Sequence, residues 1–216
     1  MDYYIHIPKS GGTSIKYAKE SNPNMPVHIQ TAGHNQTIHS FNQNVCFIVR
    51  DPWERFCSGF WERKTMPQRR NISKTNTFTS FGYADYNHLE TNILNQCATP
   101  DDYVSLIRKT GFQNVGVLTE LCASIQHWIG NPEEYKKQEH KVVKVFDIKN
   151  MDNIFKNHYN TELPQDAFRK RSRKLFDIEQ SYECSPSNTV WFTEEFRKAD
   201  YKLIEYITQQ NYYAKD

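Results

Sequence analysis

The sequence predicts an α/β fold in which a parallel β-sheet is flanked by helices, built as a single domain over residues 1–216. Two observations predict it. Short apolar runs that are typical of buried strands alternate along the chain with segments of helical periodicity. The 216 residues also suffice to bury a core without the help of disulfides or a structural metal. Neither internal repeats nor a low-complexity linker divides the sequence.

Two strand–loop–helix units are expected in the first part of the chain. Residues 4–7 predict a strand that stops at Pro8, and the small-residue loop 9–14 leads into a helix over residues 15–20. The unbroken apolar run at residues 45–49 predicts a second strand, which is buried on both faces.

A helix is expected to begin directly after this second strand. Asp51 suits its N-cap and Pro52 its first position. Five apolar residues then recur at helical spacing: Trp53, Phe56, Cys57, Phe60 and Trp61. Residues 62–80 are polar, basic and without periodicity, so we interpret them as a long surface loop. This loop is the candidate surface for an anionic sugar chain, with Trp61 and Phe78 available to stack on sugar rings; a solvated loop without a ligand is the alternative interpretation.

The second half of the chain contains start and stop signals for four further elements. The sequence predicts a helix opened by Thr99-Pro100 and closed by Gly111, a helix over about 118–129 with Gly130 as C-cap, a strand over 141–146, and a long helix from Ser185-Pro186 to about Ile207.

Charge and cysteine content exclude several classes of protein. The 27 Lys and Arg residues nearly balance the 25 Asp and Glu residues, so bulk charge does not favour binding to nucleic acid. No apolar stretch approaches the roughly 20 residues that span a bilayer, and residues 1–4 lack the pattern of a signal peptide. Most of the five scattered cysteines are expected to be reduced and to fill apolar space: Cys46, Cys57, Cys97, Cys122 and Cys184.

The loop at residues 9–14 has the groups that a phosphate cradle requires. Its two adjacent glycines let backbone N–H groups crowd around an anion, and the following helix adds its positive N-terminal end. Lys9 supplies a point charge, while Thr13 and Ser14 supply hydroxyls. A glycine turn with a solvated lysine is the alternative interpretation of the loop alone. In kinase P-loops the lysine follows the last glycine, next to the hydroxyl that binds the metal; here it precedes both glycines, which favours an anion whose transfer needs no metal.

Two stretches, HIPKSGGTS at residues 6–14 and VRDPWERFCS at residues 49–58, resemble motifs of the carbohydrate sulfotransferases that use 3′-phosphoadenosine 5′-phosphosulfate (PAPS). The resemblance is closest to the branch of the heparan sulfate 2-O- and 6-O-sulfotransferases. In that family the first motif, typically H-I-P-K-T-G-G-T-S, binds the 5′-phosphosulfate, and the second, R-D-P-x-x-R-F-x-S, holds the 3′-phosphate. This chain differs in the first motif only at Ser10 and matches every fixed position of the second. The resemblance implies a P-loop-kinase-like sulfotransferase fold.

The same resemblance implies roles for individual residues. Lys9 is expected to be catalytic and to contact the donor, and the Gly33-His34 pair matches a family pattern whose histidine is the catalytic base. Within the basic run 168–174, Ser172 and Arg173 are expected to contact the cofactor, although a solvated charged face is the alternative interpretation. The remaining donor-binding residues are expected to be Ser10, Gly11, Gly12, Thr13 and Ser14 around the 5′-phosphosulfate, and Arg50 and Ser58 at the 3′-phosphate.

The function expected from these residues is transfer of the sulfuryl group from PAPS to a hydroxyl of an acceptor, a carbohydrate above all, without a metal ion. His28 and His39 are alternatives to His34 as the base, and local hydrogen bonding suits both better. Two other functions remain open: a nucleotide-dependent kinase, and a non-catalytic module that binds nucleotide or sulfated glycan. The expected compartment is the cytoplasm for the chain as it stands, or the Golgi lumen if it is a domain of an anchored protein.

Overall fold

The computed structural model describes residues 2–28, 36–72, 94, 96–111, 123–151, 156–157, 159–161 and 182–214. Contacts between Cα atoms divide the chain into two compact units. Unit 1 comprises residues 1–52, 124–170 and 197–216, and unit 2 comprises residues 53–123 and 171–196. A division by contacts does not test the single domain expected over residues 1–216, which stays a prediction.

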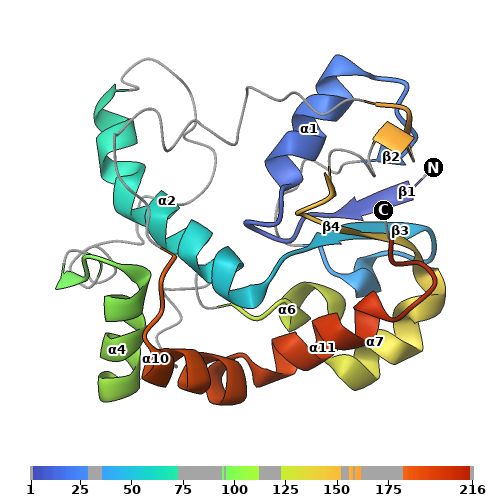
Figure 1. Cartoon of the computed structure of the whole chain (residues 1–216). Helices are drawn as coiled ribbons and strands as arrows, with labels where there is room; N and C mark the ends of the chain where they lie inside the picture. Colours follow the sequence, from blue (N-terminus) through green and yellow to red (C-terminus); the bar gives the residue numbers. More distant parts are fainter. Residues whose placement is uncertain are drawn as a thin grey trace. The chain divides into compact units, whose positions relative to one another are not determined.

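Unit 1 contains a parallel sheet of four strands in the order β2-β1-β3-β4 (Figure 1). Every pairing between neighbouring strands is parallel. The strands are β1 (Asp2–Ile5), the two-residue β2 (Val27–His28), β3 (Val45–Val49) and β4 (Val142–Asp147). Helices in the described part of unit 1 include α1 (Gly12–Ser21), α6 (Gln126–Ile129), α7 (Pro132–Gln138) and α11 (Lys198–Thr208), with 3₁₀ turns η2 (Ile38–Ser40) and η5 (Glu139–Lys141). The predicted α/β class is therefore confirmed.

Helices cover both faces of this sheet. Helix α1 lies on one face, and α6, α7 and α11 lie on the other (Figure 1). All five residues of β3 are buried, as the apolar run predicts, and they alternate between the two faces. Ile48 belongs to the core cluster that also contains Ile15 of α1. On the opposite face, the ring of Phe47 meets the ring of Tyr135 of α7 edge-on, with 6.3 Å between the centroids.

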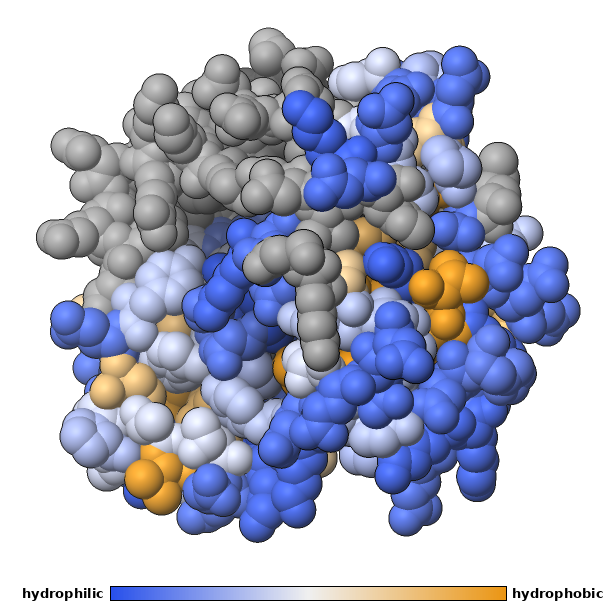
Figure 2. Space-filling model, turned by 45° about the vertical axis from the view of Figure 1, so that its right-hand side comes forward, coloured by the Kyte–Doolittle hydropathy of each residue, from blue (hydrophilic) through white to orange (hydrophobic). Residues whose placement is uncertain are grey.

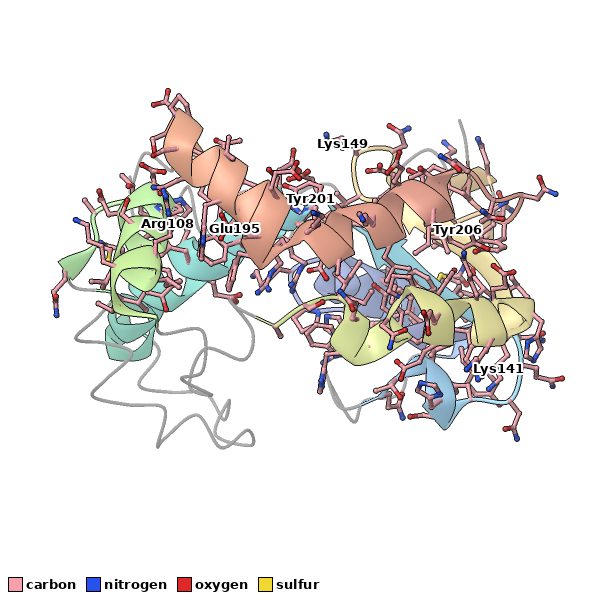
Figure 3. The ribbon with its side chains drawn as sticks, turned by 90° about the horizontal axis from the view of Figure 1, so that it is seen from below. Arg108, Lys141, Lys149, Glu195, Tyr201 and Tyr206 are labelled. Atoms are coloured by element: carbon pink, nitrogen blue, oxygen red, sulfur yellow. The ribbon has the colours of Figure 1, made fainter. Side chains whose placement is uncertain are left out.

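Polar side chains fix α11 and the segment that follows it within unit 1. The Tyr206 hydroxyl donates to Oε2 of Glu139 at 2.7 Å, and the Tyr135 hydroxyl donates to that of Tyr212 at 3.0 Å; Figure 3 draws these side chains and labels Tyr206. The amide of Val145 then donates to the carbonyl of Tyr212 at 3.0 Å, and the amide of Ala214 donates to the carbonyl of Val145 at 2.9 Å. These backbone bonds cover part of the outer edge of β4, which limits pairing with another chain there.

The described part of unit 2 is helical. Its elements are α2 (Pro52–Ile72), whose first residue belongs to unit 1, α4 (Pro100–Thr110), α10 (Pro186–Trp191) and the π-helical η6 (Phe192–Phe196). Helix α4 has the predicted bounds, because Thr99 accepts from the amide of Asp102 and Gly111 ends the helix at φ 64°. Phe56 stacks on Tyr103 and meets Phe192 edge-on, with centroids 5.9 and 5.3 Å apart.

The surface loop predicted for residues 62–80 is wrong over residues 62–72, which continue α2; residues 73–80 lie outside the described residues. Glu62, Arg63 and Lys64 are good helix formers, and the buried aromatic face before them fixes the helix that they extend. The role of Trp61 as a stacking surface for sugars is also wrong, because its side chain is buried and packs edge-on against Phe60 at 5.2 Å.

Two predicted helices differ from the structure. The helix expected over 118–129 begins only at Gln126 in the described part of the chain. Ser124 and the amide of Ile125 bond to Asp200, so the helix does not extend towards the N-terminus through these two residues. Residues 118–122 lie outside the described residues. The helix expected over 186–207 is divided by η6 and by Arg197, which has φ −124°. Packing of Phe192 and Phe196 in the aromatic core of unit 2 accompanies the break.

The described residues that Figure 2 colours by hydropathy form a largely hydrophilic surface on this face, with scattered hydrophobic residues. Among the described residues, the large hydrophobic side chains that are exposed are those of Val143 and Val190, at 40% and 60% exposure. Single exposed residues of this kind are ordinary in folded proteins. None of the helices in the described ranges combines the length and the apolar character needed to cross a bilayer.

Buried acidic groups on the α1 face of the sheet make stability depend on pH. Burial above all, with a smaller contribution from the nearby Asp2 carboxylate, raises the pKa of the Cys46 thiol to about 12, against the lowering effect of the Tyr159 hydroxyl. Neither this thiol nor those of Cys57, Cys97 and Cys184 takes part in a disulfide. In the unfolded chain the same thiol ionises near pH 9.0. The contribution to stability is therefore complete below about pH 9.0 and is lost as the pH rises towards about 12.

We expect the free energy of unfolding, measured with urea at a series of pH values, to fall steadily above pH 9.0. The Cys46→Ala variant removes the thiol and is expected to fall less steeply, although the buried tyrosines Tyr4 and Tyr159, whose pKa values are also raised by burial, keep part of the slope. Identical slopes for the variant and the parent protein would contradict the assignment to Cys46.

Candidate anion-binding site

The candidate site lies in unit 1, at the carboxyl ends of β1 and β3. Strand β2 pairs on one side of β1 and β3 on the other, so the chain changes direction across the sheet between β1 and β3. Open α/β sheets bind ligands outside the carboxyl ends of their strands, at this kind of switch point. The loop before α1 and the residue Arg50 leave the sheet at these two strand ends.

A hydrogen bond joins the two sequence motifs directly. Nη1 of Arg50 donates to the backbone carbonyl of Lys9 at 3.1 Å. The two residues are 41 positions apart in the chain, and adjacent strands β1 and β3 bring them together. An arginine carries five N–H donors, so this bond to the loop is compatible with a further contact to an anion.

The backbone of the loop takes left-handed conformations at Lys9, with φ 64°, and at Gly11, with φ 83°. A non-glycine residue in this region costs about 1 kcal/mol or more, and such residues cluster at functional sites. Helix α1 begins at Gly12, and the amides of Ser14 and Ile15 both donate to the carbonyl of Gly11. The first amides of a helix have no partner within it, so those of Gly12 and Thr13 are left to bind a ligand.

Ser10 is fully buried, and its hydroxyl has no hydrogen-bond partner among the described residues. Its amide donates to the carbonyl of Ile7 at 3.2 Å, which fixes the residue within the turn. Buried polar groups in proteins are nearly always hydrogen-bonded. The orphaned hydroxyl is therefore consistent with a site that a polar ligand completes.

The two glycines of the loop are required for different reasons. A Cβ on Gly11 would lie 2.9 Å from Sδ of Met151, and its φ of 83° already favours glycine. A Cβ on Gly12 would lie 2.0 Å from Cδ2 and 2.1 Å from Nε2 of His6. His6 and Met151 therefore border the cradle. Neither residue was predicted to belong to the site, although the position of His6 in the first motif was a signal for one of them.

The structure brings together only part of the predicted set. Ser58 is half-buried on α2 and belongs to unit 2, so its place at the 3′-phosphate stays a prediction. His34, Ser172 and Arg173 lie outside the described residues, as do the side chains of Thr13 and His28. Ser14 is half-buried in the first turn of α1, and His39 is exposed on η2.

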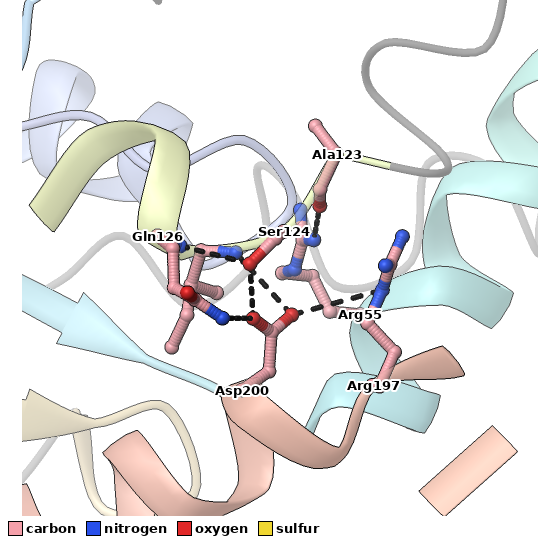
Figure 4. A network of polar contacts seen from close by, with 7 residues as sticks. Arg55, Ala123, Ser124, Gln126, Arg197 and Asp200 are labelled. Carbon is pink, nitrogen blue, oxygen red and sulfur yellow. Dashed lines mark hydrogen bonds and ion pairs between the residues drawn. The ribbon is translucent and has the colours of Figure 1, made fainter. Parts of the chain in front are cut away.

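A second polar cluster in unit 1 surrounds the buried carboxylate of Asp200 (Figure 4). It accepts hydrogen bonds from the Ser124 hydroxyl and from Nε2 of Gln126, the latter at 3.1 Å, and it pairs with Nε of Arg197 at 3.6 Å. The cluster joins α11 to the start of α6. Because each of its bonds serves the packing of these two elements, we interpret it as structural.

No group of three or more metal-ligating side chains occurs among the described residues. Comparison of the chain with family models, with curated proteins and with solved structures gave no match.

Proposed function

We propose that the protein is a sulfotransferase that moves the sulfuryl group of PAPS to a hydroxyl of an acceptor, with a carbohydrate as the favoured acceptor class. The proposal includes a P-loop-kinase-like form of the fold. The parallel sheet of unit 1 and the loop before α1 are the features that support this part of the proposal. It rests on the two motifs of the sequence together with the arrangement of unit 1.

One observation carries the proposal: the hydrogen bond from Arg50 to the carbonyl of Lys9, at the point where the sheet changes direction. The bond places the start of the second motif against the loop of the first. A donor with a phosphosulfate at one end and a phosphate at the other needs cationic and N–H donor groups from two parts of the chain. The adjacent ends of β1 and β3 provide them.

The groups around the loop fit the anionic 5′ end of such a donor. The amides of Gly12 and Thr13 point out of the first turn of α1, where the helix dipole favours negative charge. The orphaned hydroxyl of Ser10 can donate to a phosphosulfate oxygen, and the Ser14 hydroxyl is a further candidate. Arg50 suits the 3′-phosphate, because its planar fork matches phosphate geometry.

The reaction needs a charge, a base and an aligned acceptor. The acceptor oxygen attacks sulfur, the bond between sulfur and the bridging oxygen of the donor breaks, and adenosine 3′,5′-bisphosphate (PAP) leaves. Lys9 stabilises the negative charge that develops on that bridging oxygen. His34 takes the proton of the acceptor hydroxyl.

Calorimetric titration with PAP tests the binding half of the proposal. We expect PAP to bind the parent protein, and the Arg50→Ala variant to bind it about 10–100-fold more weakly, because a charge-assisted contact contributes about 1.5–3 kcal/mol. Arg50→Lys keeps the charge but not the fork and is expected to lie between the two. The exposed Arg108, whose Nη1 donates to Oδ1 of Asn188 in unit 2, gives a matched control in Arg108→Ala.

Two outcomes would overturn the proposal. Folded parent protein that takes up no PAP would exclude a PAPS-dependent enzyme. Binding of ATP in the presence of Mg²⁺, without any binding of PAP, would indicate a nucleotide-dependent kinase instead.

A further inference from the structure

The imidazole of His6 lies against the backbone of the cradle. A Cβ built on Gly12 would be 2.0 Å from Cδ2, 2.1 Å from Nε2 and 2.7 Å from Cγ of this ring. Real Cβ atoms essentially never approach another atom below 3.0 Å. Because Cγ lies at the root of the imidazole, rotation of the ring alone does not clear this space. The ring therefore occupies the volume that any side chain at position 12 would need.

The position of His6 in the fold explains why its ring is held there. It directly follows β1, whose Tyr4 is buried in the core of unit 1. The Tyr4 and His6 rings are neighbours, with centroids 6.3 Å apart and an angle of 35° between their planes. The half-buried imidazole is thus placed between the end of β1 and the start of α1.

The contact matters because Gly12 is the first residue of α1. Its amide and that of Thr13 are the donors that the helix leaves to a ligand. The position of these two amides depends on the distance between β1 and the start of α1. The imidazole edge of His6 lies between the two elements, so its thickness sets this distance. A smaller side chain at position 6 would let the first turn shift, and a methyl group at position 12 would push it away.

We propose that His6 is a positioning residue for the anionic 5′ end of the nucleotide: its imidazole edge fixes the depth of the Gly12 and Thr13 amides and reserves position 12 for glycine. This inference rests on the proposed function. It adds a residue that acts on the 5′ end of the donor and not on its 3′-phosphate.

A pair of ligands separates this role from a general effect on stability. PAP and adenosine 3′-monophosphate share the nucleoside and the 3′-phosphate, and only PAP has a 5′-phosphate. The ratio of their dissociation constants, measured by calorimetry, therefore reports on the cradle alone. Melting temperatures recorded for the same samples show whether each variant is folded.

The parent protein is expected to prefer PAP over adenosine 3′-monophosphate, and His6→Ala to reduce this preference about 10-fold by loosening the amide contacts. Gly12→Ala is expected to reduce it about 10–100-fold, in line with the cost of overpacking. In the double variant His6→Ala/Gly12→Ala the methyl group enters the space left by the ring, so the preference is expected to recover above that of Gly12→Ala. His140→Ala, at an exposed histidine of η5, is the control and is expected to leave the preference unchanged.

The possible outcomes distinguish the two proposals. A parent protein that binds both ligands equally contradicts the proposed function. A parent that prefers PAP, combined with an unchanged preference in His6→Ala, overturns only the role of His6. A double variant whose loss equals the product of the two single losses also overturns that role, because independent effects multiply in this way. If Gly12→Ala does not fold, a folded double variant supports the steric relation and an unfolded one contradicts it.

Discussion

Replacement of Lys9 by alanine is expected to lower the kcat of sulfuryl transfer about 10²–10³-fold while weakening PAP binding much less. Negative charge grows on the bridging oxygen as its bond to sulfur breaks, so a cation at this point contributes more in the transition state than in the ground state. Lys9 has a left-handed backbone conformation, with φ 64°, and the hydrogen bond from Arg50 to its carbonyl restrains the backbone there. Initial rates with labelled PAPS give kcat, and calorimetry with PAP gives the affinity.

Two further variants test whether the loss of activity is specific to the positive charge at position 9. Lys9→Arg keeps the positive charge and is expected to retain more activity than Lys9→Ala. Lys16→Ala removes a lysine from the exposed side of α1, where it lies 3.9 Å from Glu20, and an exposed pair of this kind contributes little. Alanine is preferred to glycine at position 9, because glycine would also relax the left-handed backbone. A Lys9→Ala enzyme with the kcat of the parent would exclude a role for this charge in the chemical step.

Local signals were sufficient for the elements that the sequence predicted correctly. The five apolar residues Val45–Val49 left no alternative to a buried strand, and Thr99 and Gly111 marked both ends of α4 through the cap geometry that the structure contains. The short helix α7 was missed, although the same kind of signal was present: Asn131 and Glu134 form a capping box, with Pro132 at the first position.

Other features depend on packing between distant residues and could not be predicted. Helix α2 continues through Pro67, a residue type that usually ends a helix, so the polar segment 62–72 offered no reason to extend it. The helix expected over residues 186–207 contains no proline or glycine at its break, so the sequence gives no signal for the break. It accompanies the aromatic contacts of Phe192 and Phe196 and the pairing of Arg197 with Asp200.

The candidate site likewise combines features that the sequence reveals with features that depend on packing between distant residues. The glycines and the charges of the motifs are visible in the sequence because each is a residue type with a chemical purpose. The contact between His6 and Gly12 is not visible, since it depends on the distance between the end of β1 and the start of α1. The bond from Arg50 to Lys9 likewise depends on the pairing of β1 with β3.

Replacement of His34 by alanine is expected to lower kcat about 10²–10⁴-fold, the usual contribution of a general base, without changing the affinity for PAP. The two quantities separate because the imidazole takes its proton from the acceptor and not from the donor. A base must be neutral to act, so the kcat of the parent enzyme is expected to rise with pH as the imidazole loses its proton. In His34→Ala this dependence on pH is expected to disappear together with the rate.

The neighbouring histidines give the matched comparison. His28→Ala and His39→Ala remove the same group from the same segment of the chain, and His39 is exposed on η2, where an alanine disturbs little. If His34 is the base, both variants keep the kcat and the pH profile of the parent enzyme. Loss of turnover in His28→Ala or His39→Ala, with full activity in His34→Ala, would transfer the role to that histidine. A PAP-binding protein in which none of the three variants changes kcat would have to use a base other than these histidines, and the role of His34 would then be excluded.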